Sequence, residues 1–318
     1  MAKGIFTQGL VVLLKSAQKI DALRQHLFGY KIGKQVDGLG EPWLSGPAVI
    51  VEYRPEVNGL ISVDTVSAPW PDHMGDAKTE SMLFSAWAMG HFGPLTFPSG
   101  MRRAAEQCWS WQNGREAVDS HAAFVRLRLS YTFGADGDAR VMPADCDPEH
   151  ELLFLTKMAS ALLESESALC YFNPNGEVLL PKAALDAALK HHAAEDVLPI
   201  NLWSNVRMFK LDEQWLLMDS VGNGQLDTLD HEAAFPKEAF SPNEVAGFIR
   251  NMTLYVLEKG DVIKDGDTAE GPGDVNWQAK RFEKGISDPP RQVLRWLPLG
   301  QKGIPEFLLR EKSARGGT

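Results

Sequence analysis

The sequence predicts an α+β fold of two associated subdomains, in which mixed or antiparallel sheets carry helices packed on them. Segments with the two-residue period of strands and segments with the helical period alternate irregularly along the 318 residues. Hairpin patterns occur in both halves, at residues 48–66 and 200–220. A doubly wound parallel sheet would repeat strand and helix regularly, so the pattern favours layered α+β units.

The first elements are marked by apolar runs and turn residues. A continuous apolar run predicts a strand at 9–15, and Ser16 is a suitable N-cap for a helix over 17–30. Two strands follow at 48–54 and 58–66, joined by a short turn.

The middle of the chain continues with helices and one alternating strand. Residues 78–89 and 102–111 lack breakers and predict helices. Apolar and basic residues alternate over 123–133, which predicts a half-buried strand. The polar, acidic stretch 134–151 contains glycine and proline and is the predicted subdomain boundary.

The second half contains the most strongly marked helix. Ser241 precedes Pro242, Glu244 stands three residues after Ser241, and Gly260 closes the segment, which predicts a capping box and a helical stop. Its other predicted elements are helices at 149–164 and 181–193, strands at 168–172, 200–212 and 214–220, and a final strand at 291–299. We therefore expect subdomains at 1–140 and 141–300, followed by a flexible tail at 301–318.

Composition excludes several classes of protein. The chain has 32 Lys and Arg against 42 Asp and Glu, a net charge of −10, whereas nucleic-acid binding needs clustered positive charge. Cys108, Cys146 and Cys170 are an odd number at wide spacings, which is typical of reduced thiols in the cytoplasm. No apolar run approaches the ~20 residues of a membrane helix, so we expect a cytoplasmic protein with no membrane partner.

Known catalytic and cofactor motifs are incomplete. HEAAF (231–235) has Phe235 where a zinc-protease helix needs its second histidine. GNGQLD (222–227) ends in aspartate and lacks the strand-to-helix setting of a dinucleotide loop, and His191 and His192 point in different directions on a helix. We therefore expect no cofactor and no metal.

A thiol site is a further candidate. Cys108, His121 and Asp119 supply the residue types of a nucleophile, a base and an orienting acid. Cys108 stands in a tryptophan-rich, helix-like run, where a buried and inert cysteine is the more common outcome.

The run VIKDGDTAEGPGD (262–274) has the appearance of a calcium loop. Asp265 and Asp267 match its first and third positions, but Ala269, Glu270 and Asn276 miss the fifth, sixth and twelfth. We expect instead a strand from residue 261, a tight turn at 265–266 and a surface loop through 271–273.

The second half resembles a known bacterial family. The run INLWSNVRMFKLD (200–212), the helix and KDGDT turn within 242–271, and RQVLRWLPL (291–299) are similar to domain of unknown function 4261 over about residues 150–298. The resemblance implies a suppressor-of-fused-like α+β fold that binds other proteins, without transferable catalytic residues. Length, acidity and layout also resemble type VI secretion immunity proteins of the TsiT kind, which neutralise a nuclease effector.

The resemblance implies a non-enzymatic cytoplasmic protein whose partner is a cognate toxin with a basic nuclease cleft. Acidic surface loops could occupy that cleft and accelerate association. The candidate partner-binding residues are Asp136, Asp138, Asp145, Asp147, Glu149, Asp265, Asp267, Glu270 and Asp274. Two alternatives stay open: a hydrolase that uses dispersed carboxylates with His73, His91 or His121, and a protein-binding adaptor.

Overall fold

The computed structural model describes residues 3–38, 43–44, 46–133, 135 and 140–310, and divides into two compact units, 1–203 and 204–318. The predicted boundary near residue 140 differs from this division. The difference arises because β6, which follows residue 140, pairs with the N-terminal strand β1 in the same sheet. Each unit carries its own sheet and its own buried core.

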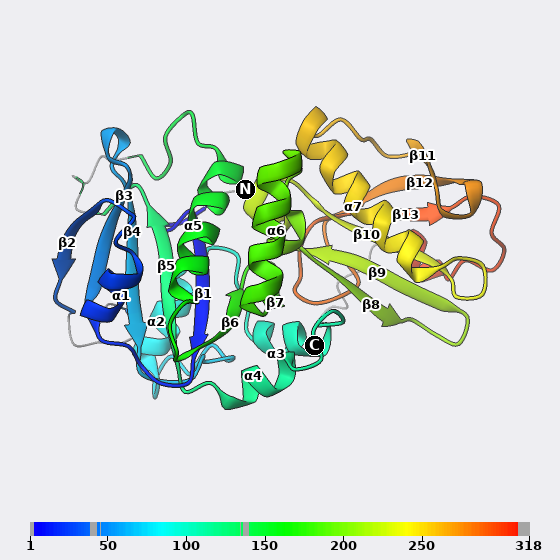
Figure 1. The fold of residues 1–318 in the computed structure, drawn as a ribbon. Coiled ribbons are helices and arrows are strands. Elements are labelled where there is room, and N and C mark those ends of the chain that lie inside the picture. The colour runs from blue at the N-terminus through cyan, green and yellow to red at the C-terminus, as the bar shows by residue number, and fades with distance from the viewer. Residues whose placement is uncertain (1–2, 39–42, 45, 134, 136–139, 311–318) are drawn as a thin grey trace. The chain divides into compact units, whose positions relative to one another are not determined.

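The first unit is built on a seven-stranded antiparallel sheet in the order β2-β3-β4-β5-β1-β6-β7 (Figure 1). Its strands are β1 (Gln8–Leu14), β2 (Ile32–Val36), β3 (Ala48–Arg54), β4 (Gly59–Val66), β5 (Ala123–Ser130), β6 (Ala168–Asn173) and β7 (Val178–Leu180). Its helices are α1 (Ile20–His26), α2 (Ser81–Ala88), α3 (Gly100–Glu106), α4 (Gly114–Ser120), α5 (Pro148–Leu162) and α6 (Lys182–Glu195).

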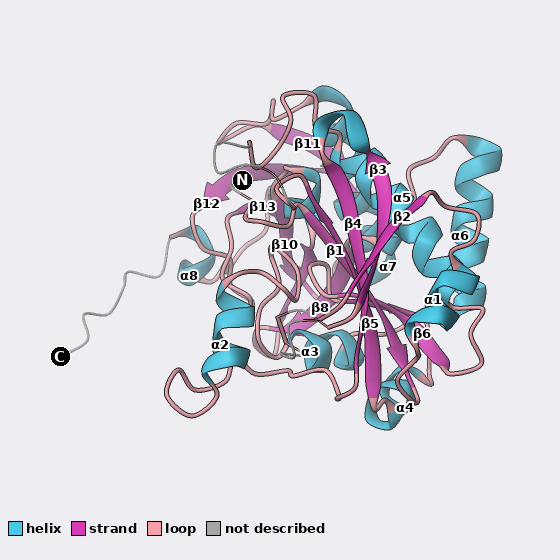
Figure 2. Ribbon diagram, turned by 90° about the vertical axis from the view of Figure 1, so that its left-hand side faces the viewer, coloured by secondary structure: helices cyan, strands magenta, loops and turns pink. Residues whose placement is uncertain are grey.

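Helices cover both faces of this sheet. Figure 2 shows α1, α5 and α6 on one side and α2 and α3 on the other. On the second side, Trp70 and Trp87 pack with Phe124 and Phe172 in one buried cluster. This cluster covers the part of the face formed by β1, β5 and β6.

The central strand β5 differs from the expected half-buried strand. All eight of its residues are buried, including Arg126 and Arg128. These arginines tolerate burial because Asp64 on β4 lies 2.5 Å from Arg126 Nη2 and 3.0 Å from Arg128 Nη2. The basic residues that resembled a solvent-facing row therefore belong to a buried ion-pair network.

The second unit carries a six-stranded mixed sheet in the order β11-β12-β13-β10-β9-β8. Its elements are β8 (Asn205–Lys210), β9 (Trp215–Val221), β10 (Asp230–Pro236), α7 (Pro242–Lys259), β11 (Thr268–Gly271), β12 (Val275–Phe282), β13 (Val293–Pro298) and α8 (Glu306–Leu309). β10 and β13 are parallel, and the other pairs are antiparallel. The predicted α+β class with mixed and antiparallel sheets is confirmed.

The long helix α7 packs on one face of this sheet. Val245, Phe248 and Ile249 join Trp277 and Trp296 in a buried cluster, because apolar residues at spacings of three and four share one helical face. The helix has the predicted bounds, but Ser241 makes no side-chain capping hydrogen bond. The predicted capping box is therefore wrong.

The segment after α7 also differs from the expectation. No strand forms over 261–264; instead β11 and β12 make an antiparallel hairpin around a short helical turn at Pro272–Asp274. β12 alternates polar and apolar residues over its eight positions, a strand pattern that the predictions above do not include. Among the residues with described structure, no helix is both long and apolar enough to cross a membrane.

Candidate functional site

A groove lies on the second unit between the C-terminal half of α7 and residues 262–269. Its volume is about 550 Å³. Met252 and Tyr255 stand three residues apart on α7 and line one wall, while Val262 and Ile263 line the other, with Trp296 of β13 also in the lining. The groove therefore brings side chains from a helix, a turn and a strand to one surface.

Two of these apolar side chains are open to solvent. Tyr255 is 43% exposed and Val262 is 45% exposed. Single exposed apolar residues are ordinary on protein surfaces, and here two of them line the same depression. The groove is therefore lined by apolar side chains, two of them accessible to solvent, together with the polar Asp267 and Thr268.

The turn that forms one wall is fixed by backbone and side-chain hydrogen bonds. Lys264 N donates to Asp267 Oδ2 at 2.8 Å, and Arg281 N donates to Asp265 Oδ1 at 2.7 Å. Gly266 adopts a φ of +90°, which favours glycine, and its N–H donates to Ala279 O at 2.9 Å. The two aspartates of the KDGDT run thus close a turn against β12, and the surface they support is preorganised.

An ion pair anchors the start of the same turn. Arg281 Nη1 donates to Asp261 Oδ2 at 3.0 Å, and Arg281 Nη2 donates to the carbonyl of Ile263 at 2.6 Å. The hydrogen bonds from Arg281 lower the pKa of Asp261 below its usual value. Both side chains are partly or largely exposed, so the pair positions the turn and contributes little net stability.

The sequence segment around the groove has an excess of acidic residues. Residues 258–274 contain six acidic residues and two lysines, a net charge of −4. Asp267 lines the groove directly, and Glu270 and Asp274 on the neighbouring hairpin are exposed. An apolar depression with this border is suited to a partner that offers an apolar side chain among basic residues.

The other predicted acidic cluster lies in the first unit and is engaged in local structure. Asp136 and Asp138 lie outside the described residues. Asp145 pairs with Arg54 at 2.7 Å, and Asp147 caps α5 by accepting from Glu149 N and His150 N at 3.1 and 3.0 Å. Desolvation raises the pKa of Glu149, which is half-buried.

The three histidines of the hydrolase alternative line three separate pockets. His121 Nε2 accepts from Trp70 N at 2.8 Å, while its Nδ1 bonds the carbonyl of Val118. His91 Nδ1 accepts from Arg128 at 2.6 Å, and His73 Nδ1 accepts from Gly75 N at 3.2 Å. Since backbone groups occupy both nitrogens of His121, this ring is poorly placed for proton transfer.

The candidate thiol site is also poorly set up for nucleophilic chemistry. Cys108 Sγ donates to the carbonyl of Leu179 at 3.5 Å, and burial raises the pKa of the thiol. A raised pKa disfavours the thiolate that attack requires. Across the described ranges, no three His, Cys, Asp or Glu side chains are grouped so as to hold a metal ion.

The fold and the groove define a class: an α+β protein that presents a preorganised apolar groove with an acidic border. Residues 219–297 match the model of a family described as Domain of unknown function (DUF4261). No curated protein and no solved structure matches the chain. The match confirms the expected resemblance for this part of the second half, and it spans every residue that lines the groove.

Sequence reasoning identified the turn but missed the apolar residues opposite it. Tyr255 lies next to the buried face of α7 that contains Ile249 and Val256. An exposed aromatic residue beside such a face was the sequence feature that could have indicated a contact surface. Asp267 is one of the predicted acidic residues, and Val262 is close to it in sequence. Their pairing with α7 is a tertiary contact, which local patterns do not reveal.

Proposed function

We propose that this chain is a non-enzymatic immunity protein of the cytoplasm, which binds and neutralises a type VI secretion toxin, a nuclease effector. The observation that carries the proposal is the apolar groove with its acidic border. A nuclease holds a polyanionic substrate in a basic cleft, so a rigid acidic surface is complementary to it. Exposed Tyr255 and Val262 supply the apolar anchors on which tight protein contacts depend.

The chemistry of the described residues supports a binding role. The histidines and the thiol considered as catalytic groups make hydrogen bonds within the fold. Tyr255 and Val262 at the groove are exposed to solvent and are not buried in the core. The net charge of −10 further favours a basic partner, because opposite charges accelerate association.

Co-expression with the protein encoded by the neighbouring gene tests the proposal. We expect that neighbour to be toxic to cells on its own, and we expect this chain to restore growth. Tyr255→Ala should weaken the protection. A neighbour that is harmless, or a toxin whose effect this chain does not reduce, would show that the proposal is wrong.

A further inference from the structure

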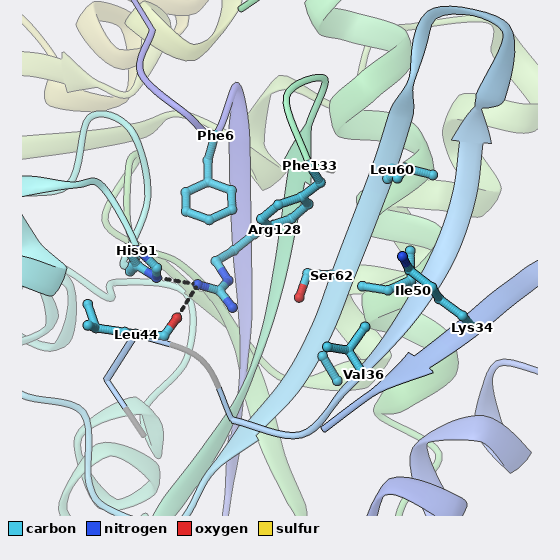
Figure 3. Close-up of a pocket in the computed structure, with 11 residues that line it drawn as sticks. Phe6, Lys34, Val36, Leu44, Ile50, Leu60, Ser62, His91, Arg128 and Phe133 are labelled. Carbon is cyan, nitrogen blue, oxygen red and sulfur yellow. Dashed lines mark hydrogen bonds between the residues drawn. The ribbon is translucent and has the colours of Figure 1, made fainter. Parts of the chain in front are cut away.

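A second cavity lies in the first unit, on the sheet face opposite α1 and α5. Its volume is about 340 Å³, at the lower end of the range for small-molecule sites. Arg128 on β5, Ser62 on β4, Ile50 on β3 and Lys34 on β2 are partners in consecutive register. Because they occupy one cross-strand row, their side chains project on the same face, where Figure 3 shows them around the cavity.

The walls of the cavity are largely apolar. Val36 lies on one side of the row and Leu60 on the other, while Phe6 and Phe133 lie near Arg128 (Figure 3). Leu44 and Ala48 also line the cavity. The two phenyl rings pack edge to face with centroids 5.4 Å apart. This lining would desolvate the body of an apolar ligand and would exclude a fully polar one.

A buried network of two arginines and one aspartate lies at one end of the cavity. Arg126 and Arg128 share a single buried carboxylate, that of Asp64. His91 adds no compensating charge: it accepts from Arg128 Nη1 at 2.6 Å, and desolvation with the two arginines lowers its pKa to about 3. Arg128 therefore has Asp64 as an ion-pair partner and the uncharged ring of His91 beside it.

Arg128 also retains an unused donor. Its side chain is 4% exposed and lines the cavity, and its Nε is buried with no hydrogen-bond partner among the described residues. A buried donor without a partner is costly, and a carboxylate is the strongest acceptor for a guanidinium N–H. The unused donor of Arg128 therefore favours an anion as the polar end of a ligand.

We infer that this cavity binds a small organic anion, a monocarboxylate with an apolar body, whose carboxylate contacts Arg128 and whose hydrocarbon portion lies over Ile50 and Ala48. Lys34 at the open rim adds a second, solvent-exposed positive charge on the approach to the site. The inference is independent of the proposed immunity function, because it concerns a different unit and different residues.

Titration calorimetry of the full chain with octanoate tests the site, with 1-octanol as the uncharged probe of equal length. We expect octanoate to bind at least about tenfold more tightly than 1-octanol, the loss typical of one charge-assisted hydrogen bond. Ser62→Leu fills the cavity without changing its charge and should weaken octanoate binding by about tenfold or more. Ser120→Leu, at an exposed position, is the matched control and should leave binding unchanged.

Thermal unfolding establishes that each variant is folded before its affinity is compared. Arg128→Met should remove the preference for octanoate over 1-octanol. Lys34→Met, on the exposed rim, provides a second charge variant that does not disturb the buried network and should weaken octanoate binding a few-fold. Absent octanoate binding, equal binding of the two probes, or unchanged affinity in folded Ser62→Leu would overturn the inference.

Discussion

Asp219 is the shared partner of two arginines in an ion-pair network of the second unit. Arg207 Nη2 lies 2.6 Å and Arg291 Nη2 2.5 Å from Asp219 Oδ2, and Ser287 donates to the same oxygen. The cross-strand row continues through Glu232 to Arg295, which lie 2.8 Å apart. The row therefore places two carboxylates side by side on β9 and β10, with Arg207 next to Asp219 and Arg295 next to Glu232, so that each carboxylate has an arginine partner inside the unit.

Asp219→Asn should destabilise the protein by about 3–5 kcal/mol, because it removes the carboxylate that the buried Arg207 shares with Arg291. Arg291 retains Asp230 at 2.9 Å, so the loss falls mainly on Arg207. Urea unfolding monitored by tryptophan fluorescence measures the change. Glu238→Gln, at an exposed carboxylate, is the control and should shift the midpoint little. Equal midpoints for Asp219→Asn and the unmodified protein would show that the network contributes no stability.

His231 makes stability dependent on pH. Its Nδ1 accepts from Trp296 Nε1 at 3.1 Å, and burial lowers the pKa of His231 from 6.5 to about 4. The unfolded chain therefore binds more protons between these values, and the contribution of His231 is present above pH 6.5 and lost as the pH falls to about 4.

His231→Gln should flatten the dependence of unfolding free energy on pH in this window, by up to ~3 kcal/mol across it. Glutamine is not titratable and retains an oxygen that can accept from Trp296. Urea titrations at pH values of about 4.5, 5.5 and 6.5 together cover this window and give the slope of unfolding free energy against pH. A slope that matches that of the exposed control His191→Gln would contradict the assignment.

At the scale of elements, periodicity predicted most helices and strands, but it did not predict the contacts between them. The apolar run of β1 and the apolar stripe of α5 were recognised because their burial is encoded in local spacing. In β5 the arginines alternate like solvent-facing residues, and only Asp64 on the neighbouring strand makes their burial possible. The groove likewise depends on a contact between α7 and a turn that follows it.

The two N-caps provide a contrast at the same scale. Asp147 accepts two backbone N–H groups at the start of α5, whereas Ser241 makes no side-chain cap at the start of α7. Asp147→Ala should therefore cost about 1 kcal/mol of unfolding free energy, and Ser241→Ala much less. Urea midpoints of the two variants measure the difference, and an equal loss in both would contradict the hydrogen-bond assignment.

For the whole molecule, the main result is a separation of roles among acidic residues. Asp64 and Asp219 neutralise buried arginines, Asp147 and Asp265 hold turns and helix starts, and exposed acids surround the groove. Composition gave only the net charge of −10, because the same residue type serves all these purposes. We propose that the acidic residues around the groove bind a basic partner.

The most direct test of this account is the affinity of the chain for the toxin that we propose as its partner, measured by calorimetry for two matched variants. Val262 and Leu299 are 45% and 44% exposed in the same unit, and only Val262 lines the groove. We predict that Val262→Ser weakens binding by about tenfold or more, while Leu299→Ser changes it less than about twofold. Equal affinities of both variants and the unmodified protein would contradict the assignment of the groove as the binding surface.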